Sequence, residues 1–192
     1  TNPQIMLKSK IFMKRIRLVL FFVFLGIFSA AFQLGSMSTV DEKEASAFME
    51  EFEKLVLDID AFGIFTHNLT IALPMLIPGF GVAWGLFSAW STGFAFAAIT
   101  TTAPELASIP PLSILLLSPF GLMELTAYSL GISRSYILIK AIIKKTALIQ
   151  FIKPTLIEIS IVIGLLLAGG YLEFYMIEFA LESGFDMPGF DL

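Results

Sequence analysis

Two polar side chains in otherwise apolar stretches are the strongest candidates for chemistry in this chain. They are His67, its one histidine, and Glu124. A charge inside a bilayer is costly, so a retained one is a functional-site hypothesis by default. If the helix that carries Glu124 begins at Pro119, this side chain lies five residues along it, about 7–8 Å deep at 1.5 Å per residue. His67 lies five residues into another apolar stretch from the same side, so we expect the two side chains to pair between adjacent helices.

Such a pair has three interpretations: a structural clamp that fixes the register of two helices, a proton relay, or a metal site. The clamp is favoured, because polar side chains commonly join membrane helices. One histidine and one carboxylate are a poor ligand set for zinc or copper, so we expect no metal and no cofactor. Asn68 is expected to form a hydrogen bond across helices. Glu158, five residues after Lys153, is expected to snorkel or to pair at the inner end of its helix.

The sequence lacks the patterns of the common enzyme classes. It has no cysteine, which excludes disulfides and thiolate chemistry. It contains no HExxH pattern, no nucleophile elbow and no glycine-rich phosphate loop. An intramembrane hydrolase would need a nucleophile with its base, or two carboxylates, and neither arrangement is found. We therefore expect a protein without catalysis of its own.

The helices that position these residues follow from apolar runs. The chain is 57% hydrophobic, against about 45–50% in soluble domains, which indicates one all-α membrane domain over 1–192. A span needs about 20 apolar residues. The first run is longer than the core of a signal peptide, about 7–15 residues, and is expected to be a span. Five transmembrane helices are predicted, over 18–35, 62–78, 80–99, 112–132 and 155–175.

Proline and glycine mark where these helices break. Pro74, Pro78 and Gly79 separate the second helix from the third. Ser118 before Pro119 is a helix-start signal, so the fourth helix is either kinked there or consists of a short re-entrant piece, 112–117, and a helix from 119. The second reading is favoured. Small residues are expected to let helices approach closely; they are Gly79, Gly81, Gly85, Gly93, Gly121, Gly164, Ala168 and Gly169.

Two amphipathic segments are predicted outside the spans. Over 41–60, apolar residues at i, i+3, i+4 and i+7 alternate with an acidic face. This helix, capped by Ser38 or Thr39, is expected to lie on the outer membrane surface or on the transmembrane helices. Its acidic residues are the expected partner-binding surface: Asp41, Glu44, Glu51 and Asp58. The basic segment 134–153 is expected to be an interfacial helix that ends at Pro154.

The charges also predict an orientation. Ten of the 12 Lys and Arg residues lie in two clusters, over 8–17 and 134–153, and 14 of the 16 acidic residues lie in other segments. Cytoplasmic segments next to spans carry the excess of Lys and Arg. The protein is therefore expected in the cell membrane, with its N-terminus on the inner side and its C-terminus on the outer side. A nucleic-acid surface is not expected, because each basic cluster adjoins a span.

Two runs of residues carry a family resemblance: Ile64-Phe65-Thr66-His67-Asn68-Leu69 and Pro119-Phe120-Gly121-Leu122-Met123-Glu124-Leu125-Thr126-Ala127. They resemble motifs of the stage II sporulation protein M family, multi-spanning membrane proteins of bacteria and archaea. The chain departs from the motifs at His67, where asparagine is usual, and at Phe120, where histidine is usual. The resemblance implies a prokaryotic membrane protein in which Asn68, Pro119, Gly121 and Glu124 matter most. The sporulation member is a non-catalytic component of a cell-wall remodelling complex.

These observations favour a membrane scaffold or an accessory subunit of a larger membrane complex. Its partners would be other membrane proteins and lipid, and a homo-oligomer is compatible with the pattern. The alternative is a transporter or channel component that uses His67 and Glu124, because polar groups on Pro-interrupted helices are typical of transport sites.

Overall fold

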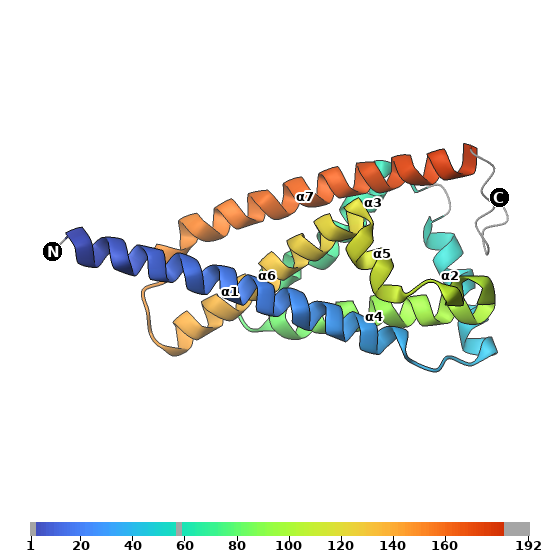
Figure 1. Cartoon of the computed structure of the whole chain (residues 1–192), viewed down its shortest axis with the longest axis horizontal. Coiled ribbons are helices and arrows are strands. Elements are labelled where there is room, and N and C mark those ends of the chain that lie inside the picture. The colour runs from blue at the N-terminus through green and yellow to red at the C-terminus, as the bar shows by residue number, and fades with distance from the viewer. Residues whose placement is uncertain (1–2, 57–58, 183–192) are drawn as a thin grey trace.

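The computed structural model describes residues 3–56 and 59–182, and these residues form an all-α bundle (Figure 1). The described part contains seven α-helices and two short 3-10 helices, η1 and η2. In chain order they are α1 (Pro3–Ser36), α2 (Glu42–Val56), α3 (Ala61–Ala72), η1 (Leu73–Leu76), α4 (Phe80–Thr102), η2 (Pro104–Ser108), α5 (Pro111–Leu117), α6 (Pro119–Ile143) and α7 (Ile149–Glu182).

Three described helices are long and apolar enough to cross a membrane. They are the part of α1 over Arg15–Ser36, all of α4, and the part of α7 over Ile149–Ala180. The pair α5 and α6, bent by 86°, makes a fourth if it is one span. The segment Ala61–Leu76 is apolar but shorter. The prediction of apolar helices long enough to cross a membrane is confirmed for three to four helices, and the five-span arrangement stays a prediction.

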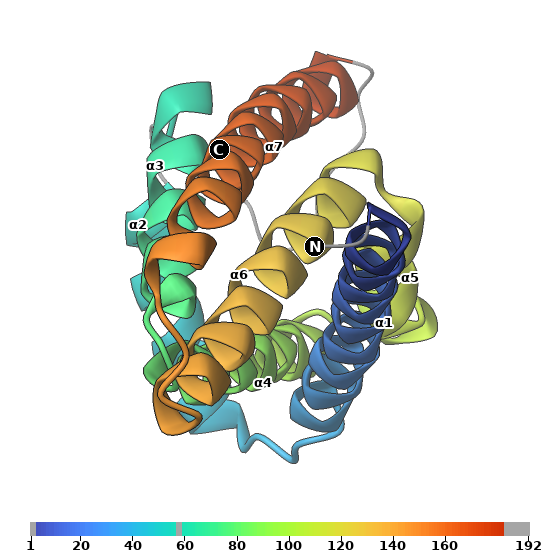
Figure 2. The same ribbon diagram turned by 90° about the vertical axis from the view of Figure 1, so that its left-hand side faces the viewer.

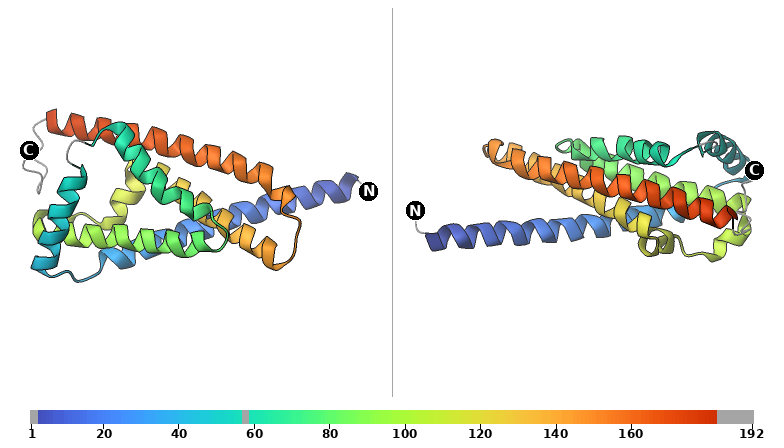
Figure 3. Two further views of the ribbon diagram at one scale, coloured as in Figure 1. Left: turned by 180° about the vertical axis from the view of Figure 1, so that it is seen from behind. Right: turned by 90° about the horizontal axis from the view of Figure 1, so that it is seen from above.

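Helix α6 is the centre of the bundle. It packs against α1, α3, α4, α5 and α7, and Figure 2, which looks along the bundle, shows it surrounded by them. The first turns of α1 and the last turns of α7 lie at opposite ends of the molecule, and α2 lies across the end where α7 finishes (Figures 1 and 3). We call this the acidic end. The opposite end, with the start of α1 and the α6–α7 turn, is the basic end.

The fourth predicted helix is broken at Ser118. The Ser118 side chain accepts a hydrogen bond from the Gly121 N–H at 3.0 Å, and Pro119 occupies the first turn. Both features begin a helix rather than continue one. The predicted break at 118–119 is therefore confirmed, and the pair α5 and α6 fits either one broken span or a re-entrant piece followed by a helix. Whether α5 is re-entrant stays a prediction.

Helices α6 and α7 differ from the predicted ends. Helix α6 continues to Ile143 instead of 132, and α7 begins at Ile149 instead of 155. The separate interfacial helix over 134–153 is therefore wrong, because its residues belong to α6, the turn and α7. Pro154 lies inside α7; it removes one backbone hydrogen bond early in a long apolar helix, which membrane helices tolerate.

A Schellman turn ends α6 where the basic segment lies. The Thr146 N–H bonds to the Ala141 carbonyl at 2.9 Å and the Lys145 N–H to the Ile142 carbonyl at 3.0 Å. Lys145 has φ 52°, the left-handed conformation that this motif requires and that glycine usually supplies. This turn reverses the direction of the chain, so that α7 runs back along the bundle.

The predicted acidic helix is confirmed, with different caps. Asp41 caps α2, because its Oδ1 accepts from the Glu44 N–H at 2.9 Å, so the cap expected at Ser38 or Thr39 is wrong. Asp60, expected inside this helix, instead caps α3 by accepting from the Gly63 N–H at 2.7 Å. An aspartate cap satisfies a free N–H group at a helix start, which explains why the acidic stretch divides between two helices.

Helices α1 and α4 are in backbone contact. A Cβ built on Gly93 would overlap the Phe32 carbonyl oxygen and lie 2.8 Å from the Ser36 nitrogen, and Gly35 meets the backbone of α4 in the same way. The expected packing role of Gly93 is confirmed, as is that of Gly85, which faces Ile132 of α6. For Gly164 it is wrong, because a Cβ there would have nothing within 4 Å.

Candidate functional site

Asn68 of α3 and Glu124 of α6 form a hydrogen bond inside the bundle. The Asn68 Nδ2 donates to Glu124 Oε1 at 2.6 Å. Asn68 is buried and Glu124 is half-buried. The residues are 56 positions apart in the chain, so the bond joins two helices. The predicted role of Asn68 in bonding across helices is confirmed.

The expected pairing of His67 with Glu124 is wrong. His67 is exposed on the surface of α3, whereas its neighbour Asn68 faces α6. Successive residues of an α-helix point about 100° apart, since a turn has 3.6 residues. Only one of the two side chains can therefore reach α6, and it is the amide.

The start of α6 fixes the position of Glu124. With Pro119 in the first turn, Glu124 lies in the second turn of the helix, as predicted. A Cβ on Gly121 would lie 2.5 Å from the Ser118 Oγ and 2.8 Å from the Ile114 carbonyl oxygen. The close bend between α5 and α6 thus requires glycine, and this bend places Glu124 against α3.

A second carboxyl group, Glu173 of α7, was not predicted for this region. It is half-buried and acts electrostatically on Glu124. Helix α7 approaches because it has glycines here: a Cβ on Gly170 would lie 3.0 Å from the Phe65 nitrogen of α3, and one on Gly169 3.5 Å from the Met123 Cβ of α6. No local pattern in the sequence singles out Glu173, which lies near the end of the last predicted span, 155–175.

A buried ion cluster joins three helices towards the basic end. Arg134 of α6 holds Glu158 of α7 with two hydrogen bonds, Nε to Oε2 at 2.7 Å and Nη2 to Oε1 at 2.6 Å. Arg17 of α1 adds Nε to the same Oε1 at 2.7 Å, and its Nη1 donates to the Ser133 Oγ at 2.9 Å. We call these residues the Arg–Glu cluster: Arg17, Ser133, Arg134 and Glu158.

The Arg–Glu cluster is well shielded. The side chains of Arg134, Glu158 and Arg17 are 5%, 12% and 20% exposed. Two guanidinium groups share one carboxylate, and the planar fork of arginine makes the double contact with a carboxylate that lysine cannot make. The expectation that Glu158 snorkels or pairs at the inner end is met by pairing. The charge pattern does not predict its arginine partners, because the orientation rule treats Arg17 and Arg134 only as members of the basic clusters beside the spans.

The break before α4 is anchored to α6 by one hydroxyl group. The Ser135 Oγ donates to the Ile77 carbonyl at 2.6 Å and accepts from the Gly79 N–H at 3.0 Å. Gly79 has φ 80°, a conformation that favours glycine. With Pro74 in η1 and Pro78 before the glycine, the predicted break is confirmed. Ser135 satisfies backbone groups that a break leaves without helical partners.

The expected acidic partner surface lies on α2. Ala45 and Met49 are buried and α2 packs against α4, so the helix rests on the bundle, one of its two expected positions. Asp41, Glu44 and Glu51 are exposed. Asp58 lies outside the described residues. Within the described helices, this surface and the Asn68–Glu124 pair belong to different contacts, since α2 packs on α4 whereas the pair joins α3 to α6.

The described residues contain no group of three or more His, Asp or Glu side chains that could hold a metal ion. The geometry offers three polar joints between elements, at Asn68–Glu124, at the Arg–Glu cluster and at Ser135, and an exposed acidic surface on α2.

Comparison with protein-family models, with curated proteins and with solved structures finds no match for this chain. The resemblance to the stage II sporulation protein M family consequently rests on the two runs of residues alone.

Proposed function

We propose that the chain is a non-catalytic scaffold or accessory subunit of a larger complex in the cell membrane. In this proposal it crosses the membrane five times, through α1, α3 with η1, α4, α5 with α6, and α7. The N-terminus is inside and the C-terminus outside, as excess Lys and Arg mark the cytoplasmic side. The opposite placement of the first turns of α1 and the last turns of α7 in Figure 1 supports this topology.

The crossing by α3 and η1 is shorter than the other four. Its 12 α-helical and four 3-10 residues are fewer than the usual span of about 20 residues. One side of it is, however, covered by protein: α3 packs on α7, and η1 packs on α4 and α6. Irregular backbone at membrane depth is tolerated where protein covers it, and Ser135 satisfies the break that follows.

The fixed acidic face of α2 is the observation that carries the proposal. The helix is held by its buried Ala45 and Met49 against α4, so its exposed carboxylates have a defined position on the bundle. Glu44 and Glu51 are seven residues apart, two turns of helix, and therefore lie on one side of it. Glu50 lies on another side and is paired with Lys54 at 2.7 Å. Exposed carboxylates held in place would suit a partner with basic groups.

The family resemblance points in the same direction. The four positions that it singles out lie at one joint: Asn68 bonds to Glu124, and Pro119 and Gly121 begin the helix that carries Glu124. Such a joint fixes helix register, which suits a rigid platform for other proteins.

The first prediction uses the absence of cysteine from the chain, which allows single cysteines to be read without background. In intact cells, Glu51→Cys should react with a short, membrane-impermeant cross-linker. The cross-linker should join the chain to its partner protein in one adduct of defined mass. Glu50→Cys, on the other side of α2, should be labelled without that adduct. Lys145→Cys, at the basic end, should not be labelled until the membrane is opened. Labelling of Lys145→Cys in intact cells would overturn the topology. Equal yields of the cross-linked adduct from Glu50→Cys and Glu51→Cys would overturn the assignment of the partner surface to the side of α2 that carries Glu51.

A transport role is the second candidate, favoured by one observation. The Asn68–Glu124 bond joins two interrupted helices, α3 with η1 and α5 with α6, and interrupted helices with polar groups are typical of transport sites. A carboxylate that serves only as a joint can be replaced by an amide, which still accepts the Asn68 hydrogen bond.

The second prediction separates these roles. Glu124→Gln should leave thermal stability and partner binding unchanged, whereas Glu124→Leu should lower the free energy of unfolding by about 1 kcal/mol, because the buried Asn68 amide loses its acceptor. The measurements are the unfolding midpoint in one detergent and cation or proton flux into proteoliposomes. Flux in the wild type that Glu124→Gln abolishes without loss of fold would favour transport over the scaffold.

A further inference from the structure

The α6–α7 turn exposes apolar and basic side chains together. Ile143 and Ile149 are 73% and 74% exposed, and Lys140, Lys144 and Lys145 beside them are exposed as well. Exposure of large apolar groups to water is unfavourable, and so is burial of a charged lysine in hydrocarbon. Both kinds are satisfied at the boundary between acyl chains and headgroups, where apolar groups enter the membrane and lysines reach towards phosphates.

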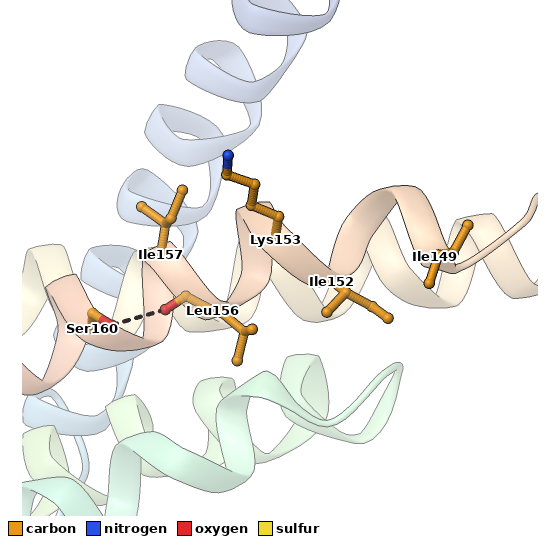
Figure 4. A pocket seen from close by; sticks show the side chains of 6 residues that line it. All are labelled: Ile149, Ile152, Lys153, Leu156, Ile157 and Ser160. Atoms are coloured by element: carbon orange, nitrogen blue, oxygen red, sulfur yellow. Dashed lines mark hydrogen bonds between the residues drawn. The ribbon is translucent and has the colours of Figure 1, made fainter.

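A shallow, open groove runs along the surface of α7 from this turn (Figure 4). It has a volume of about 420 Å³, and its lining comes from one helix: Ile149, Ile152, Lys153, Leu156, Ile157 and Ser160. Along the helix axis these residues cover about 16 Å at 1.5 Å per residue. The Ser160 hydroxyl bonds to the Leu156 carbonyl at 3.0 Å, so the groove is apolar apart from the Lys153 amine. Among the described residues Lys153 makes no ion pair.

The charges at the basic end lack a counterion within the described chain. Glu158 is the one carboxylate there, and it is already shared by Arg17 and Arg134. Among the residues whose exposure the structure describes, the exposed cations at this end are Arg15, Lys140, Lys144, Lys145 and Lys153. An anion from outside the chain would complement them. A phospholipid with an anionic headgroup supplies that charge and an apolar chain in one molecule.

We propose that the start of α7 seats one anionic phospholipid of the leaflet at the basic end. Its phosphate lies at the Lys153 amine, and one acyl chain lies along the groove towards Ser160. The surrounding lysines of the turn contribute attraction to the same headgroup region. This inference goes beyond the scaffold role and does not depend on it.

The third prediction tests the headgroup contact. The full chain, purified in mild detergent, is mixed with equal amounts of phosphatidylglycerol and phosphatidylcholine, and retained lipid is counted by native mass spectrometry. The wild type should retain phosphatidylglycerol preferentially. Lys153→Gln should lower that preference about five-fold, since each basic residue near an anionic surface adds roughly this factor. Lys43→Gln, an exposed lysine on α2 with the same change of charge, should leave it unchanged.

The groove is tested by a second pair of variants. Leu156→Gln should reduce retained phosphatidylglycerol, and Leu167→Gln, an exposed leucine of α7 outside the groove, should not. Equal effects within either pair would overturn the proposal, because net charge or general polarity would then explain retention. Displacement of the lipid by millimolar inorganic phosphate would also overturn it, as a free anion would then be the ligand.

Discussion

Replacing Glu158 with alanine is expected to lower the free energy of unfolding by about 3–5 kcal/mol, because it leaves buried charges without their counterion. Arg134 is 5% exposed and Arg17 20%, so water can solvate neither guanidinium group fully. The same change also removes the carboxylate at which side chains of α1, α6 and α7 meet. We expect a lower unfolding midpoint, measured by near-UV circular dichroism in one detergent.

The chain contains a matched control for this fourth prediction. The Glu50–Lys54 pair has a similar distance, 2.7 Å, but its side chains are 72% and 68% exposed. Hydrogen bonding to Lys54 lowers the pKa of Glu50. The stability that this pair adds is therefore present above the unfolded pKa of a glutamate and lost as the pH falls through the lowered value. Solvent screens the pair, so Glu50→Ala should leave the midpoint unchanged within error.

A compensating variant makes the interpretation sharper. Replacing Arg17, Arg134 and Glu158 together with Met, Met and Leu should recover most of the lost stability, because a buried ion cluster can often be exchanged for apolar side chains at little cost. If Glu158→Ala is as harmless as Glu50→Ala, the cluster is solvated and the three helices do not meet there. If the triple variant is no better than the single one, the loss comes from packing and not from unpaired charge.

The sequence was sufficient for features that depend on local pattern. Uncharged apolar runs predicted α1 and α4, and the apolar spacing with acidic residues predicted α2. Ser118 with Pro119 predicted the start of α6, since a cap and a first-turn proline act within one turn of the chain. The break between Pro74 and Gly79 could be predicted for the same reason, because proline and glycine act on the backbone next to them.

The sequence was insufficient where two interacting residues are distant in the chain, and where the rotation of a helix about its axis determines which side chain faces the bundle. Arg17 is 141 positions from Glu158 in the chain, and the topology rule counts its charge without regard to a partner. His67 and Asn68 are neighbours, and only the packing of α3 on α6 and α7 determines which of them faces inward. The ends of α6 and α7 were missed because a Lys-rich stretch with a proline reads as a boundary, whereas the Schellman turn at Lys145 sets it.

Replacing Gly93 with alanine, at the crossing of α1 and α4, is expected to lower the stability of the protein. The added Cβ would overlap the Phe32 carbonyl oxygen and approach the Ser36 nitrogen at 2.8 Å. Both are backbone atoms of α1, so relief requires the helices to separate rather than a side chain to rotate. Overpacking a close contact usually costs about 1–3 kcal/mol, and we expect the upper part of that range, read as a lower unfolding midpoint.

Two glycines of the same protein provide controls that change the same atoms. A Cβ on Gly164 of α7 or on Gly26 of α1 has nothing within 4 Å. Gly164→Ala and Gly26→Ala should therefore be neutral, or stabilising by up to about 1 kcal/mol through the better helix propensity of alanine. Gly26 is the sharper control, because it lies on the helix that Gly93 contacts. A Gly93→Ala midpoint equal to that of Gly26→Ala would mean that α1 and α4 do not cross in backbone contact. Since α2 rests on α4, the position of the acidic face relative to α1 would then be undefined, and the scaffold proposal would lose its rigid platform.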